Sequence, residues 1–213
     1  MPKHWLFTLG LAIWPALALP NGFEDFEDAR LIDHVAGSVA RGYARMHGFK
    51  VEFKMLPESQ QQASALLVQY HPATRTCTYL INTRDESWHS FENYLKFFEG
   101  LPKKLVYEAF FAHETGHCVQ LKEQIDFGPE RRNMHQELFA DVFALSHVER
   151  YYPPYRQPFL RALINMRKVE RGTSYAFSAQ LQRLAYSPEL LTALKVKDPQ
   201  ERAFAIAHAV DRL

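Results

Sequence analysis

The segment His113-Glu114-Thr115-Gly116-His117 constrains this chain more than any other feature. Its two histidines are four residues apart, so on an α-helix their side chains lie on one face, one turn above the other. Two imidazoles in that arrangement can bind one metal ion, and zinc is the usual ion for this pattern. Glu114 lies beside that face, where its carboxylate can accept a proton from an attacking water. The segment therefore predicts a helix that carries half of a zinc site.

A second pair of polar residues supplies the rest of a metal site. With 10 His in 213 residues, an HExxH pattern arises by chance in roughly 3 of 100 such chains, so the motif needs support. Glu137 lies 20 residues after His117, and Asp141 follows it by one helical turn, so both carboxylates lie on one face. One of them can bind the metal, while the other can accept the second ring N–H of a ligand histidine. A catalytic zinc site uses three protein ligands, and these residues complete that number.

HETGH followed by Glu137 and Asp141 resembles the pattern of the gluzincin metallopeptidases, the thermolysin-like clan. The resemblance covers roughly residues 101–149, about a quarter of the chain. It implies that His113, His117 and Glu137 bind Zn²⁺. It also implies that Glu114 is the general base and that Asp141 accepts a hydrogen bond from a ligand histidine, His113. The reaction that it implies is hydrolysis of peptide bonds, with a peptide or protein as the substrate.

The chain departs from the gluzincin pattern in the residues that stabilise the oxyanion. Thermolysin-like enzymes have a tyrosine between the two zinc helices and a histidine further on, whereas residues 118–136 contain no tyrosine. The alternatives to Glu137 as third ligand are His135 and Asp141. The metzincin pattern fails, because position 123 is Glu where that family needs a third histidine. The candidates for the oxyanion donor are His147, Arg150, Tyr151, Tyr152, Tyr155 and His208.

A non-catalytic zincin-like protein is the competing interpretation, with a structural zinc or with a partner that it binds without cleaving. The fourth position on the metal separates the two interpretations. In an enzyme that position is open beside Glu114, whereas in a structural site a side chain such as His135 or Cys77 fills it. A zinc hydrolase that acts on a non-peptide amide is a third possibility.

Residues 1–18 are typical of a secretory signal peptide. A short polar start precedes an apolar run from Trp5 to Leu19, in which Ala16-Leu17-Ala18 supplies small residues for cleavage. The run is too short for a stable membrane anchor. We therefore predict an exported protein, periplasmic or secreted, with residues 19–213 as a single zincin-like metallopeptidase domain. The alternative is an uncleaved anchor or a buried N-terminal helix.

Composition narrows the class of protein further. The formal net charge is +1, with 25 basic and 24 acidic residues, so the basic surface typical of nucleic-acid binding is not expected. A hydrophobic content of 47% with 16 Phe is typical of a compact globular protein.

The two cysteines, Cys77 and Cys118, form either a disulfide or two buried thiols. The sequence carries no signal for an oligomeric state.

Hydrophobic periodicity predicts an α+β fold, with a small sheet of three or more strands packed on the HExxH helix and a helical C-terminal part. That helical part is expected below the HExxH helix, as the other wall of a cleft. We expect strands over residues 49–55, 65–70 and 77–82, and we assign residues 78–82 to the edge that binds substrate. Helices are expected over residues 26–47, 88–98, 103–122, 159–169, 174–185, 188–194 and 199–210, and from an N-cap at Asn133 to Tyr151.

Overall fold

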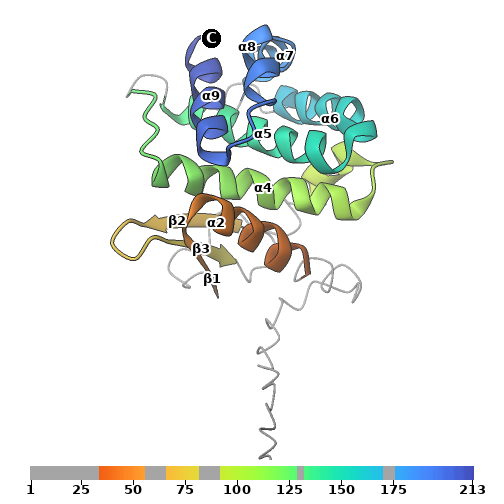
Figure 1. Ribbon diagram of the computed structural model, residues 1–213. Helices are drawn as coiled ribbons and strands as arrows, with labels where there is room; N and C mark the ends of the chain where they lie inside the picture. Colours follow the sequence, from red (N-terminus) through yellow and green to blue (C-terminus); the bar gives the residue numbers. More distant parts are fainter. Residues whose placement is uncertain (1–33, 56–65, 82–91, 129–131, 170–175) are drawn as a thin grey trace, which may run out of the picture.

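Two long helices form the centre of the molecule (Figure 1). The computed structural model describes residues 34–55, 66–81, 92–128, 132–169 and 176–213. Helix α4 (Lys103–Lys122) and helix α5 (Arg132–Tyr151) pack against each other along their lengths. A small sheet and helix α2 (Arg41–His47) lie on one side of α4, and the C-terminal helices lie on the other side, over α5. The described part of the chain is therefore α+β and mostly helical, as predicted.

The sheet has three strands in the order β1-β3-β2. Strand β1 (Lys50–Met55) runs parallel to β3 (Thr76–Ile81), and β2 (Leu66–His71) runs antiparallel to it. All three predicted strands are confirmed to within two residues at either end. The assignment of residues 78–82 to the edge of the sheet is wrong, because β3 pairs with a strand on each side. Every residue of β3 is buried, so the centre of the sheet is the position that suits it.

The helix predicted over residues 26–47 ends where the sequence indicates. A π-helical stretch (Ala36–Ala40) leads into α2, and Gly48 follows with a φ of 70°. That left-handed conformation suits glycine, and the N–H of Gly48 donates to the carbonyl of Ala44. Residues 26–33 lie outside the described residues, as does the predicted signal peptide.

Helix α4 has the predicted bounds. Pro102 precedes it as the N-cap residue and does not belong to the first turn. Helix α5 begins at Arg132, so Asn133 lies inside its first turn and the predicted N-cap is wrong by at least one residue. Of the helix predicted over residues 88–98, residues 92–95 are helical and Lys96–Phe98 forms a 3₁₀ turn, while residues 88–91 lie outside the described residues.

The C-terminal part is helical, as predicted, and it packs on α5 (Figure 1). Helix α5 therefore stands between most of this part and α4, whereas we expected this part to pack below the HExxH helix as the other wall of a cleft. The elements of this C-terminal part are a 3₁₀ turn (Pro153–Tyr155), α6 (Arg156–Val169), α7 (Ser178–Ala185), α8 (Pro188–Ala193) and α9 (Pro199–Asp211).

None of the described helices is both long enough and apolar enough to cross a lipid bilayer.

A disulfide between Cys77 and Cys118 joins the centre of the sheet to α4. The two Cα atoms are 5.9 Å apart, and the bond spans 41 residues of sequence. Closing a loop of that length stabilises the folded chain by about 4 kcal/mol in the chain-entropy model. Of the two outcomes that the sequence allows for these cysteines, the structure has the disulfide. Because Cys118 follows the HETGH segment directly, the bond fixes the sheet beside that segment.

Candidate metal centre

Three side chains from the two central helices converge in the way that a metal site requires. The ligand atoms of His113, His117 and Glu137 all lie within 4.8 Å of one another. Nε2 of His113 is 3.5 Å from one carboxylate oxygen of Glu137, and Nε2 of His117 is 3.5 Å from the other. Tetrahedral ligands at zinc bond lengths are about 3.4 Å apart. The ligand atoms of these three residues are therefore close enough together to hold one metal ion.

Gly116 allows the two helices to approach closely at this point. A Cβ atom added to Gly116 would lie 3.2 Å from the Cα of Ala140 and 3.1 Å from the Cβ of Phe143. Both of those atoms are fixed to the backbone of α5, so they cannot move aside without the helix. Glycine at position 116 thus determines how near Glu137 comes to the two histidines.

Asp141 orients the ring of His113. Nδ1 of His113 lies 3.0 Å from Oδ1 of Asp141, whose side chain is 1% exposed. A proton on Nδ1 is donated to this carboxylate, so Nε2 faces Glu137. Asp141 lies behind His113 and outside the ligand group, where the gluzincin resemblance implies it and where it cannot replace Glu137 as third ligand.

Arg167 on α6 is a buried residue of the site that the sequence reasoning missed. Its Nε and Nη2 donate to the two carboxylate oxygens of Asp141 at 2.8 and 2.7 Å. Nη2 also lies 3.4 Å from Glu137, and the guanidinium lies over the ring of Phe177. One pattern in the sequence could have pointed to Arg167. It is a cationic residue within the apolar stripe of a helix, one turn after the buried residue Leu163 of α6.

The two histidines differ in charge when no metal is bound. Burial opposes a charge on His113, but hydrogen bonds to Asp141 and Glu137 outweigh it and raise the pKa of His113 to about 10. Burial, together with the positive charge of His113, lowers the pKa of His117 to about 4. Near neutral pH, His113 is therefore protonated and His117 is neutral. Binding of a metal ion must displace the proton from Nε2 of His113.

The carboxylates of the site also differ in pKa. Burial raises the pKa of Glu114 to about 7, and the neighbouring charges of His113 and Glu137 act on it in opposite directions. Burial alone would raise the pKa of Asp141, but the charge of Arg167 and the hydrogen bonds to this carboxylate lower it to about 2. Asp141 is therefore a fixed charge at neutral pH, while Glu114 has the pKa of a group that can exchange a proton.

Thr115 anchors the middle of the HETGH segment to the sheet. Its hydroxyl donates to the carbonyl of Phe111 at 2.6 Å and accepts a hydrogen bond from Tyr79 of β3, also at 2.6 Å. Both side chains are fully buried. Together with the disulfide at Cys118, this contact fixes the HETGH turn of α4 against the central strand.

The side chains expected to compete for the metal lie elsewhere. His135 is buried with its ring edge-on to Phe127, and it does not join the ligand group. Cys77 is bonded to Cys118 and offers no thiolate. Within the described residues, the ligand group therefore consists of His113, His117 and Glu137.

Two of the six candidates for an oxyanion donor are bound to a residue outside this group. His147 and Tyr152 both bind Glu108, and His147 lies about 15 Å along α5 from Glu137 at 1.5 Å per residue. The carboxylate of Glu108 holds both side chains through these hydrogen bonds. Within the described chain, no hydrogen bond or ion pair joins Arg150, Tyr151, Tyr155 or His208 to the three ligands.

Comparisons of the chain with protein-family models, with curated proteins and with solved structures gave no match. The functional interpretation therefore depends on the HETGH motif and on the geometry of the side chains around it.

Proposed function

We propose that this protein is a zinc-dependent metallopeptidase with a zincin-like fold. The observation that carries the proposal is the ligand group of His113, His117 and Glu137, in which Asp141 orients His113. The group combines the N and O ligands of catalytic zinc sites with the hydrogen-bonded carboxylate that commonly supports a ligand histidine. The resemblance to gluzincins agrees with these roles residue by residue.

When bound, zinc would supply a Lewis acid that lowers the pKa of water and polarises the scissile carbonyl. The side chains of the chain then divide the remaining work. Glu114 accepts a proton from the attacking water and delivers it to the leaving amine. In the metal-free site, burial raises the pKa of Glu114 to about 7, within the range in which a carboxyl group takes up and releases a proton near neutral pH. Asp141 keeps the proton of His113 on Nδ1 throughout.

The number of ligands favours catalysis over a structural metal. A structural zinc site is closed by four protein ligands, whereas the described residues offer three. The two side chains considered as a fourth ligand are held elsewhere: His135 lies against Phe127, and Cys77 is in the disulfide. The proposed mechanism therefore assigns the fourth position on the metal, beside Glu114, to water and substrate.

The disulfide also supports the proposed export of the protein to the periplasm or the medium. Bonds such as Cys77–Cys118 persist in oxidising compartments and are rare in reducing ones. We propose that residues 1–18 act as the export signal and that the remaining chain forms one domain.

Metal content tests the site directly. Purified protein should contain about one zinc per chain, measured by elemental analysis, and His113→Ala should lose it. His71→Ala is the matched control, because His71 is an exposed histidine on β2. Equal zinc contents in the His113→Ala and control variants would show that the ligand assignment is wrong.

Glu114→Gln tests the reaction. The variant should keep its zinc and cleave a peptide library about 100 to 10,000 times more slowly than the parent protein. Glu99→Gln, a change at an exposed carboxylate, should leave the rate unchanged. Full activity in Glu114→Gln with zinc bound would exclude the proposed base. Zinc binding without cleavage of any peptide in the parent protein would favour the non-catalytic alternative.

A further inference from the structure

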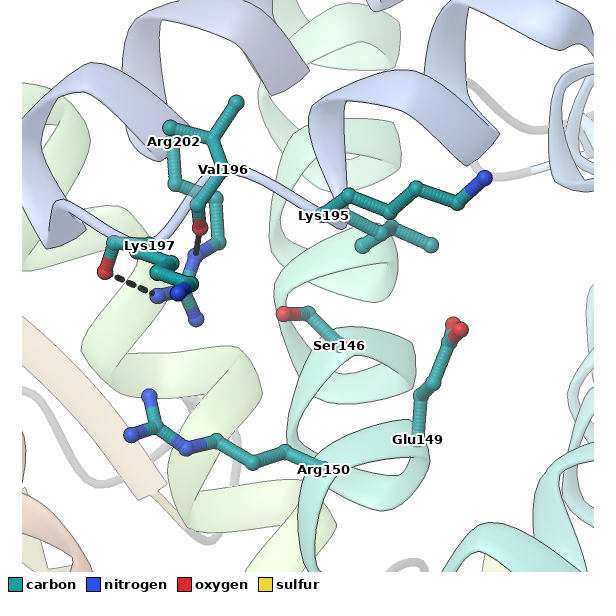
Figure 2. Close-up of a pocket in the computed structure, with 8 residues that line it drawn as sticks. Ser146, Glu149, Arg150, Lys195, Val196, Lys197 and Arg202 are labelled. Carbon is teal, nitrogen blue, oxygen red and sulfur yellow. Dashed lines mark hydrogen bonds between the residues drawn. The ribbon is translucent and has the colours of Figure 1, made fainter.

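A pocket lined mostly by charged residues lies toward the C-terminal end of α5, between that helix and the segment that joins α8 to α9 (Figure 2). Its volume is about 410 Å³. Ser146 marks the wall formed by α5, and it is nine residues beyond Glu137. That separation is about 14 Å along the helix, so the pocket is separate from the metal centre.

The pocket carries an excess of positive charge. Four of its side chains are cationic, and its single carboxylate, on Glu149, accepts a hydrogen bond from Arg156 at 3.1 Å. Arg156 is not one of the lining residues, so this carboxylate is already neutralised from outside the pocket. The four cations are Arg150, Lys195, Lys197 and Arg202. Across the described ranges of the chain, no carboxylate lies within ion-pairing distance of any of these four side chains.

Arg202 is fixed in place without a neutralising partner. Its Nε donates to the carbonyl of Val196 and its Nη2 to the carbonyl of Lys197, both at 2.8 Å. Burial, together with the positive charge of Arg150, lowers the pKa of Arg202. Asp198, whose negative charge acts on Arg202, caps α9 by accepting from the N–H of Glu201. Arg202 is therefore held at the pocket with a positive charge that no carboxylate of the described residues pairs, an arrangement that an anion would complete.

The groups that could contact an anion lie on one side of the pocket. In Figure 2, Arg150 reaches from α5 toward the guanidinium of Arg202, and the side chain of Lys197 lies beside that guanidinium. The hydroxyl of Ser146 points to the same side, and it has no hydrogen-bond partner among the described residues. Glu149 and the end of Lys195 lie on the opposite side. An anion on the first side would thus meet three cations and one hydroxyl donor.

We propose that this pocket binds a phosphate group, either as inorganic phosphate or as the charged end of a small phosphomonoester. The planar guanidinium fork matches phosphate oxygens, and a dianion offsets two of the converging positive charges where a carboxylate offsets one. A volume of about 410 Å³ equals that of roughly 13 water molecules, so an organic substituent fits beside the phosphate. The inference goes beyond the proposed peptidase activity and does not depend on it.

Calorimetric titration of the full chain with inorganic phosphate, at constant ionic strength, tests the site. Arg150→Gln should weaken binding by about tenfold or more, because it removes a charged hydrogen-bond donor. Lys197→Gln should weaken it by a smaller factor. Both side chains are exposed, so neither change should prevent folding. Arg161→Gln, which changes an exposed arginine of α6 outside the pocket, is the control and should leave the affinity unchanged.

His113→Ala separates this site from the metal centre, because phosphate can also bind to zinc. Unchanged phosphate affinity in that variant supports the pocket, and loss of affinity there would overturn the assignment. Absence of binding to the parent chain, or equal affinities in Arg150→Gln and Arg161→Gln, would also overturn it. Acetate should not compete, and if it binds as well as phosphate, the ligand class is wrong. Tighter binding of glycerol 3-phosphate than of phosphate identifies a phosphomonoester, and equal binding identifies free phosphate.

Discussion

Replacing Gly116 by alanine should destabilise the protein, although alanine is the better helix former. The close approach of α4 and α5 at this residue is the reason. The added methyl would lie 3.1 to 3.3 Å from Phe143 and 3.2 Å from the Cα of Ala140, whereas carbon atoms prefer separations of about 3.5–4.0 Å. Since these atoms belong to the backbone of α5 or lie next to it, the helix itself must move.

Two opposing terms give the size of the effect. Overpacking of a well-packed interface costs about 1–3 kcal/mol. Alanine in place of glycine inside a helix gains about 1 kcal/mol. The free energy of unfolding of Gly116→Ala should therefore fall by about 1 kcal/mol, which corresponds to a decrease in Tm of about 2–4 °C for a chain of this length. Because Ala140 lies between Glu137 and Asp141, displacement of α5 should also weaken zinc binding by about tenfold.

Gly42→Ala is the matched control. Gly42 lies in α2, and a Cβ atom there would meet nothing within 4 Å. That variant should gain about 0.5–1 kcal/mol from helix propensity alone, with unchanged zinc affinity. Urea denaturation of the metal-free variants measures the stabilities, and competition with a chelating dye measures the zinc affinities. If both variants were stabilised equally, the close contact at Gly116 would not control the spacing of α4 and α5.

The remaining predictions concern charge and the disulfide. Arg167→Met should lower the unfolding free energy of the metal-free protein by about 3 kcal/mol in urea denaturation, because the buried carboxylate of Asp141 loses its paired charge; an unchanged value would contradict this. Since the pKa of Asp141 is lowered to about 2 from a usual 3.8, its stabilising contribution is present above about pH 4 and is lost as the pH falls toward 2. Acid unfolding curves should show that loss in the parent protein and a smaller one in Arg167→Met. Zinc binding near pH 7 should release about one proton, from His113, whose pKa is about 10 without metal. Calorimetry in two buffers of different ionisation enthalpy counts that proton, and equal heats in both buffers would refute its release. Reduction of the Cys77–Cys118 bond should cost about 4 kcal/mol, seen as a lower Tm in reductant, and an unchanged Tm would speak against a structural role for the bond.

The sequence predicted the parts of the site that depend on spacing within one helix. His113 and His117 lie one turn apart, as do Glu137 and Asp141, so each helix presents its pair on one face wherever that helix packs. The bounds of the elements were predictable for similar local reasons. Proline at position 102 and glycine at position 48 mark the helix ends, because each favours backbone angles found at such ends.

Contacts between distant elements were not predictable in this way. Arg167 is 26 residues from Asp141, and only the packing of α6 on α5 brings the two together. The central position of β3 depends on strand order, which alternation along a strand does not encode. The surroundings of His147 were not predictable for the same reason, since its partner Tyr43 is 104 residues away in α2. Motif spacing thus identified the proposed ligands, while the contacts of the residues around them required tertiary structure.

Arg167 also determines the charge of the site as a whole. Glu137 and Asp141 carry one negative charge each, and together they would cancel the charge of a divalent ion once His113 has released its proton. Arg167 restores one positive charge through its contacts with both carboxylates. The same positive charge acts on Glu114, whose pKa burial raises and Arg167 lowers. A site that remains positive after metal binding favours the ionised form of Glu114, which is the form that a general base needs. A residue outside the motif, on the helix that follows the metal-binding pair, therefore helps to keep the proposed base in its active state.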